Sequence, residues 1–103
     1  MKKYQLVLQF PVGNIADFDQ LVALEDSLIK HLPASNNVDG HDCGTDEFNI
    51  FILTDEPDQT LNAADKIRLS SSTVQRPIAA YRPVLGEDYV VLWPPDYKGF
   101  SIS

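Results

Sequence analysis

Apolar side chains occupy alternate positions at the start of the chain: Tyr4, Leu6, Leu8 and Phe10. A period of two is typical of a β-strand with one buried face, and Pro11 ends this pattern. The apolar spacing then changes to three or four residues, which predicts an amphipathic helix over 17–32 that stops before Pro33. Asp17, followed by Gln20, resembles a helix N-cap. The first unit is therefore predicted to be a strand followed by a helix.

A hairpin and a second helix are predicted next. The segments 38–43 and 48–54 are strand-like and flank a short turn at 44–46 that contains a glycine. Pro57 suits the first turn of a helix, because a proline there removes no helical hydrogen bond. The spacing of apolar residues after it predicts a short helix over 57–69.

Two further strand-like runs, 78–84 and 89–93, are predicted to form a second hairpin that Pro94 and Pro95 end. The element order is then β-α-β-β-α-β with one additional strand. This order predicts a single α+β domain over 1–103: a ferredoxin-like sandwich with an antiparallel sheet and two helices on one face. The first strand is expected to lie beside 48–54 in the centre of the sheet.

The stretches Val38–Gly44 and Glu47–Pro57 are similar to small bacterial proteins of unassigned activity, and the whole chain resembles a ferredoxin-like domain. The resemblance implies the fold and no particular activity. A metal-chaperone relative would carry two cysteines in the first loop, and an acylphosphatase-like relative would carry an arginine there. This chain has neither, since its first arginine is Arg68. A small-molecule-sensing, ACT-like role stays open because Gly13 and Asn14 lie between the first strand and helix.

Acidic residues dominate the middle of the chain. The net charge is −7, and no Lys or Arg occurs between Lys30 and Lys66. That stretch contains eight acids: Asp39, Asp42, Asp46, Glu47, Asp55, Glu56, Asp58 and Asp65. An acidic region repels polyphosphates, so neither nucleic acid nor an anionic membrane is expected as a partner. The acidic region is either a solvated face or a surface for a basic partner protein.

Cys43 is the only cysteine, which excludes an intramolecular disulfide and a CxxC motif. A protein without disulfides is typical of a reducing compartment, so we predict a cytoplasmic protein. No apolar run reaches the length of a membrane-spanning helix.

The candidate site lies on the first hairpin. If its turn is 44–46, alternate residues of the two strands share the sheet face that carries no helix. We expect six residues there to form a binding surface: Asp39, His41, Cys43, Glu47, Asn49 and Phe51. Phe51, with Val7 and Leu53 nearby, makes this face apolar enough to predict its burial by a second copy, giving a homodimer, or by a ligand.

His41 carries the most suggestive chemistry of this set. Imidazole, carboxylate and thiolate groups are all transition-metal ligands, but alternate residues of one strand do not easily chelate an ion without a second element such as Glu47. A nucleophilic Cys43 is disfavoured because acidic surroundings raise the pKa of a thiol. We therefore assign no metal, cofactor or catalytic residue.

The sequence favours a binding or assembly module that acts through the open sheet face. The first alternative is an acidic protein of the inhibitor or immunity type, which uses the acidic region 39–58 to bind a basic partner protein. A small enzyme with a site around His41 is the second.

Overall fold

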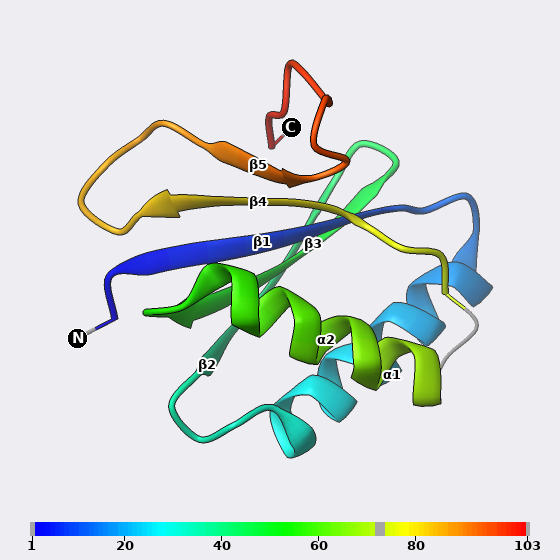
Figure 1. The fold of residues 1–103 in the computed structure, drawn as a ribbon. Helices are drawn as coiled ribbons and strands as arrows, with labels where there is room; N and C mark the ends of the chain where they lie inside the picture. Colours follow the sequence, from blue (N-terminus) through cyan, green and yellow to red (C-terminus); the bar gives the residue numbers. More distant parts are fainter. Residues whose placement is uncertain (1, 72–73, 103) are drawn as a thin grey trace.

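The computed structural model describes residues 2–71 and 74–102 and shows one sheet with two helices below it (Figure 1). The elements along the chain are β1 (Tyr4–Pro11), α1 (Ile15–His31), β2 (Asn37–Gly44), β3 (Glu47–Thr54), α2 (Pro57–Ser71), β4 (Ile78–Pro83) and β5 (Val90–Trp93). The five strands are antiparallel in the order β2-β3-β1-β4-β5. The predicted α+β class, the helices on one face and the pairing of β1 with β3 are confirmed. No helix within the described residues is long and apolar enough to cross a membrane.

The core lies between the sheet and the helices. Alternate residues of the two central strands enter it: Leu6, Leu8 and Phe10 from β1, and Phe48, Ile50 and Ile52 from β3. Leu21, Leu24 and Leu28 of α1 pack against them. Alternation in the strands and the three-to-four spacing in α1 predicted these faces because each pattern brings its apolar residues to one side.

The N-terminus of α1 differs from its prediction. The helix begins at Ile15, and Asn14 is the N-cap, whose side-chain Oδ1 accepts a hydrogen bond from Asp17 N at 3.0 Å. Asp17 therefore lies inside the first turn, where its carboxylate accepts a bond from Gly13 N at 2.9 Å. The two side chains together satisfy two backbone donors that no helical carbonyl can reach.

Replacing Asn14 with alanine is expected to lower the free energy of unfolding by about 1 kcal/mol, since it removes the N-cap acceptor. Urea unfolding of the wild type and the variant measures the difference. Asn37→Ala, at an exposed residue that begins β2, serves as the control and should leave stability nearly unchanged. An equal loss of unfolding free energy in both variants would show that the N-cap hydrogen bond of Asn14 does not stabilise the protein.

The register of the first hairpin was predicted wrongly. Gly44 pairs with Glu47, so the turn contains two residues, Thr45 and Asp46, instead of three. Asp46 adopts a positive φ of 59°, a left-handed conformation that aspartate tolerates better than most residues. Since a shift of one position moves a side chain to the other face of the sheet, His41 and Cys43 face the opposite way from the prediction.

Candidate functional site

The six residues predicted to share one face are divided between two faces. Cys43 pairs with Phe48 and His41 pairs with Ile50, so both lie on the helix side of the sheet. Glu47 and Asn49 lie on the helix-free side, as does Phe51. Asp39 is exposed in a bulge of β2 between Val38 and His41. The predicted set therefore does not form one surface.

A polar network occupies the helix-free side. Gln9 Nε2 donates to Asn49 Oδ1 at 3.1 Å and to the backbone carbonyl of Ser101 at 3.0 Å. Asn49 Nδ2 in turn donates to Glu47 Oε1 at 3.4 Å. Asn49 is fully buried, so these bonds satisfy polar groups that water cannot reach.

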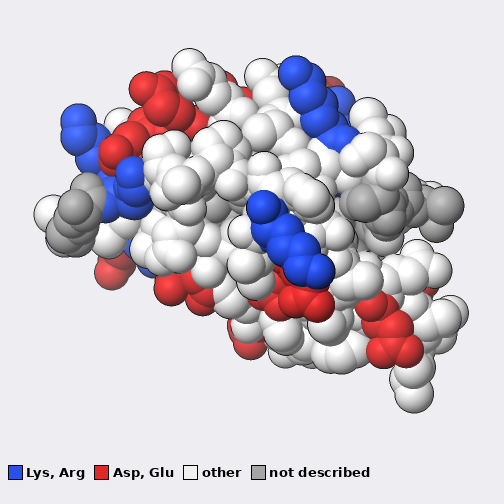
Figure 2. Space-filling view, turned by 90° about the horizontal axis from the view of Figure 1, so that it is seen from below, with Lys and Arg blue, Asp and Glu red and all other residues white. Residues whose placement is uncertain are grey.

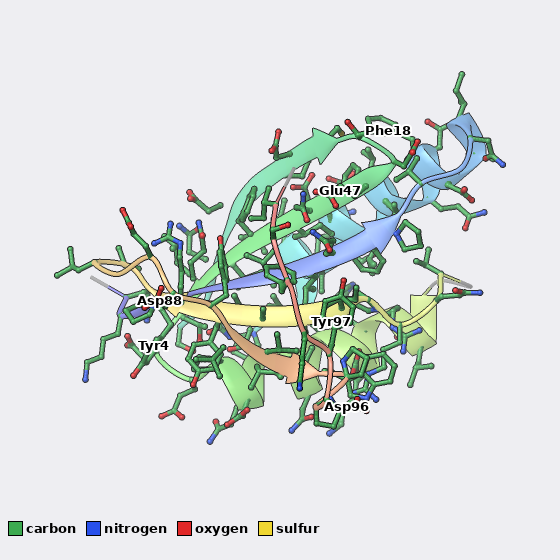
Figure 3. All side chains as sticks on the ribbon, turned by 90° about the horizontal axis from the view of Figure 1, so that it is seen from above. Tyr4, Phe18, Glu47, Asp88, Asp96 and Tyr97 are labelled. Carbon is green, nitrogen blue, oxygen red and sulfur yellow. The ribbon has the colours of Figure 1, made fainter. Side chains whose placement is uncertain are left out.

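The C-terminal segment that follows β5 crosses this face. Figure 3 shows it running over β4 and β1 towards β3, and Figure 1 shows it on the side of the sheet opposite the helices. The Phe100 ring contacts Tyr89 with ring centroids 4.9 Å apart. Val7 and Ala80, which pair with each other on this face, are both fully buried. The part of this face around Val7 and Ala80 is therefore covered by residues of the same chain, whereas Phe51 and Leu53 are only half-buried.

His41 belongs to an aromatic cluster beside α1. Its Nδ1 lies 2.9 Å from Glu25 Oε1, a hydrogen bond that the carboxylate accepts. The imidazole stacks on Phe48 with ring centroids 4.6 Å apart, and Phe18 meets both rings edge-on. The carboxylate thus sets the orientation of the imidazole, while the rings fix its position.

Glu25 is the site residue that the sequence interpretation missed. Its residue surface is only 7% exposed, and among the described residues no hydrogen-bond partner reaches its second oxygen, Oε2. Glu25 follows Leu21 by four positions and precedes Leu28 by three, which places it on the buried stripe of α1. An acid within a leucine stripe was the available signal, because buried carboxylates are rare without a partner.

The cluster lacks the arrangement that metal binding or nucleophilic catalysis needs. Within residues 2–71 and 74–102, no three His, Cys, Asp or Glu side chains converge closely enough to hold a metal ion. Cys43 is exposed, and no hydrogen bond between described residues joins its thiol to His41. A nucleophile needs its base within hydrogen-bonding reach, so the geometry here does not activate the thiol.

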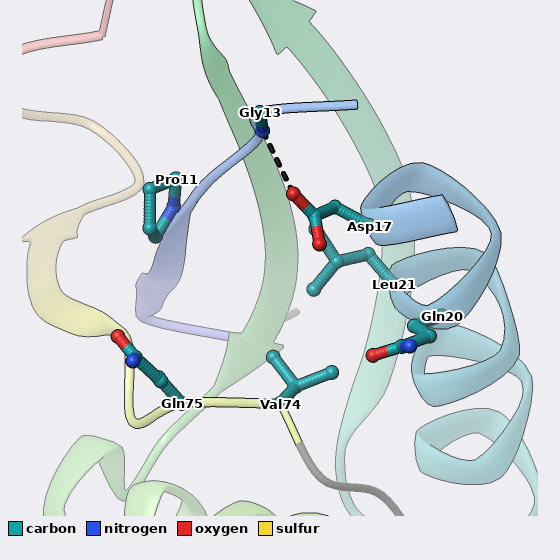
Figure 4. A pocket seen from close by; sticks show the side chains of 7 residues that line it. All are labelled: Pro11, Gly13, Asp17, Gln20, Leu21, Val74 and Gln75. Atoms are coloured by element: carbon teal, nitrogen blue, oxygen red, sulfur yellow. Dashed lines mark hydrogen bonds between the residues drawn. The ribbon is translucent and has the colours of Figure 1, made fainter. Parts of the chain in front are cut away.

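A shallow pocket of about 300 Å³ lies at the end of β1 and the start of α1 (Figure 4). Its lining consists of Pro11, Gly13, Asp17, Gln20, Leu21, Val74 and Gln75. The Gly13 N–H, which an ACT-like sensor could offer to a small molecule, is already donated to Asp17. The pocket therefore gives little support to the small-molecule alternative.

Part of the acidic middle region has structural partners. The pKa of Asp55 is lowered, mainly because its carboxylate accepts the backbone N–H of Lys3, with a smaller effect from the Lys2 ammonium. Asp65 forms ion pairs with Arg68 and Arg76. These acids connect segments of the fold.

The basic residues are scattered on the helix side. In Figure 2, which views this side, Lys and Arg form separate islands and not a continuous basic track.

Apolar side chains are exposed along one side of α1. Ile15 is 80% exposed, Phe18 37% and Ile29 60%. Val22 lies between them and is half-buried against the core. We call these four residues the α1 stripe. Phe18 connects the stripe to His41, so the aromatic cluster and the stripe form one continuous surface.

No protein-family model, curated protein or solved structure matches this chain.

Proposed function

We propose that this protein is a protein-binding module with a ferredoxin-like fold, acting in the cytoplasm. The strand order β2-β3-β1-β4 with both helices on one face supports this fold, and β5 extends the sheet at one edge. The free Cys43 and the lack of any second cysteine favour a reducing compartment.

The α1 stripe is the observation that carries the proposal. Single exposed apolar residues are ordinary, but several on one helix face beside an aromatic cluster form a patch of the kind that partner proteins cover. The helix-free sheet face, in contrast, already has a cover in the C-terminal segment. The partner surface is therefore assigned to α1 and not to the sheet.

The partner is a basic protein, as in the inhibitor or immunity type of interaction. Asp19 and Asp26 are exposed on α1, and Lys30 in the last turn is the only Lys or Arg of this helix. Acidic residues beside an apolar row speed association with a basic partner and disfavour acidic ones. The same charge disfavours nucleic acid.

The homodimer and enzyme alternatives have weaker support. The C-terminal segment, which bonds to Gln9, reduces the apolar surface that the helix-free face offers to a second copy, and leaves the half-buried Phe51 and Leu53 for such a contact. Catalysis around His41 has an oriented imidazole in its favour, but no activated nucleophile accompanies it.

Photo-crosslinking in the cells that naturally contain the protein tests the proposal. A photoreactive amino acid at Ile15 or Ile29 is expected to give a discrete adduct with one protein. The same amino acid at Leu85, which is 92% exposed in the β4–β5 connection, is the control and should give none. Equal labelling from all three positions, or none from α1, contradicts the proposed function.

A further inference from the structure

The α1 stripe has the spacing of a helix-packing surface. Ile15, Val22 and Ile29 are seven residues apart, so they deviate by only about 20° per interval around the helix. They extend over about 21 Å of the helix axis, at about 1.5 Å per residue. Ala16 and Ala23 follow the first two and are exposed. Because alanine is small, another helix can approach α1 closely along this row.

Acidic residues repeat beside the stripe at the same interval. Asp19 follows Ile15 by four positions, and Asp26 follows Val22 by four. Charges at this position of a seven-residue repeat select the partner helix in coiled-coil packing. Both acids are exposed, and neither has an ion pair with another described residue. A partner helix with Lys or Arg beside its apolar row complements them.

Two other ways of binding a partner have less support: pairing of α1 with a second copy of itself, and addition of a strand to an edge of the sheet. In a two-fold pair the same patch meets itself, so the acidic rows formed by Asp19 and Asp26 come close together and repel. Strand addition needs a regular edge, but the bulge at Asp39 and Gly40 interrupts β2, and Gly40 has a positive φ of 104°. At the other edge, β5 contains only four residues.

We propose that the partner's docking element is a basic amphipathic helix that lies along α1. This inference rests on the proposed function and specifies which element of the partner fills the surface. The apolar row of the incoming helix covers Ile15, Val22 and Ile29, while its basic residues face Asp19 and Asp26.

A charge-exchange experiment with synthetic peptides tests the docking mode. One peptide of about three heptads carries Leu at the two apolar positions and Lys at the flanking positions, and its counterpart carries Glu in place of Lys. Affinities are measured by fluorescence anisotropy for the wild type and for Asp19→Lys/Asp26→Lys. The Lys peptide is expected to bind the wild type at least tenfold more tightly than the variant, and the Glu peptide to show the reverse preference.

Two controls separate docking along α1 from general attraction between charges. Glu56→Lys/Asp58→Lys changes the net charge by the same amount at exposed sites near the start of α2 and should retain at least half of the wild-type affinity for the Lys peptide. A Lys peptide with the same composition in scrambled order should not bind. In amide NMR spectra, the amphipathic peptide should shift the signals of residues 15–30.

Three results overturn the helix-docking inference. They are equal losses of affinity for the Lys peptide in both double variants, binding of the scrambled peptide as tight as that of the amphipathic one, and amide signal shifts confined to β2. The photo-crosslinking result distinguishes this failure from failure of the proposed function. If Ile15 and Ile29 give an adduct but the peptides show no charge preference, a partner does bind α1, but its docking element is not a basic helix. Absence of the adduct contradicts the function itself.

Discussion

Truncation after Trp93 is expected to destabilise the protein by about 3 kcal/mol and to make it associate with itself. The truncated chain loses the bond from Gln9 to the Ser101 carbonyl and the contact between Phe100 and Tyr89. It also loses the cover over the helix-free face, where Val7 is fully buried in the intact chain. Each large apolar side chain returned to water costs roughly 1.5 to 3 kcal/mol, and an exposed apolar sheet face promotes association.

Light scattering measures the association, and urea unfolding measures the stability. Leu85→Ser is a suitable control because it alters an exposed apolar residue away from this face and should change neither quantity. Phe100→Asp is the milder companion variant, with the complete chain present, and should show the same two effects to a smaller degree. A truncated protein that keeps both the mass and the stability of the intact chain shows that the sheet's own side chains are sufficient to bury Val7.

The sheet centre could be predicted from the sequence because its pattern permits only one arrangement. In β3, Phe48, Ile50 and Ile52 alternate with other residues, so only one face can enter the core. Among the apolar residues of β2, only Val38 packs against the core cluster, and the polar residues that make up most of this strand do not show by their pattern which face is buried. The register of β2 therefore depended on the length of the turn, which has two residues where three were predicted.

The candidate site was less predictable because its decisive contacts are distant in sequence. The bond from Gln9 to Ser101 joins residues 92 positions apart, and its acceptor is a backbone carbonyl, which every residue possesses. The α1 stripe did leave a signal, since Ile15 and Ile29 are apolar residues outside the leucine row that fills the core. Phe18 precedes Leu21 by three positions and so continues the leucine row in the sequence, but it lies at the boundary of that row and is partly exposed.

The second large effect is expected at His41. In His41→Ala, neither oxygen of the buried Glu25 carboxylate keeps a hydrogen bond to another described residue, and Phe48 loses the stacked imidazole. Leaving a buried charged group without its partner costs about 2 kcal/mol, and the lost ring contact adds about 1 kcal/mol. Urea unfolding should therefore show a loss of about 3 kcal/mol. His31→Ala, at the exposed last turn of α1, is the matched control and should cost less than half as much.

Glu25→Met is expected to have the opposite sign. Methionine fills a similar volume without a charge, and exchanging a buried ionic group for an apolar one is often neutral or stabilising, here by about 1 kcal/mol. His41, whose side chain is 33% exposed, can replace the lost carboxylate with water. In the Glu25→Met background, His41→Ala should cost only the ring contact, so the double-mutant cycle should give a coupling of about 2 kcal/mol.

The sign of the Glu25→Met effect decides how the carboxylate is held. A gain in stability means that Oε2 lacks a partner in the folded protein, so an unpaired buried oxygen persists beside the α1 stripe at a cost to stability. A residue retained at such a cost is typical of a binding surface rather than a core. A loss of about 2 kcal/mol instead means that an ordered water satisfies Oε2, and the Glu25–His41 pair is then an ordinary structural element of the fold.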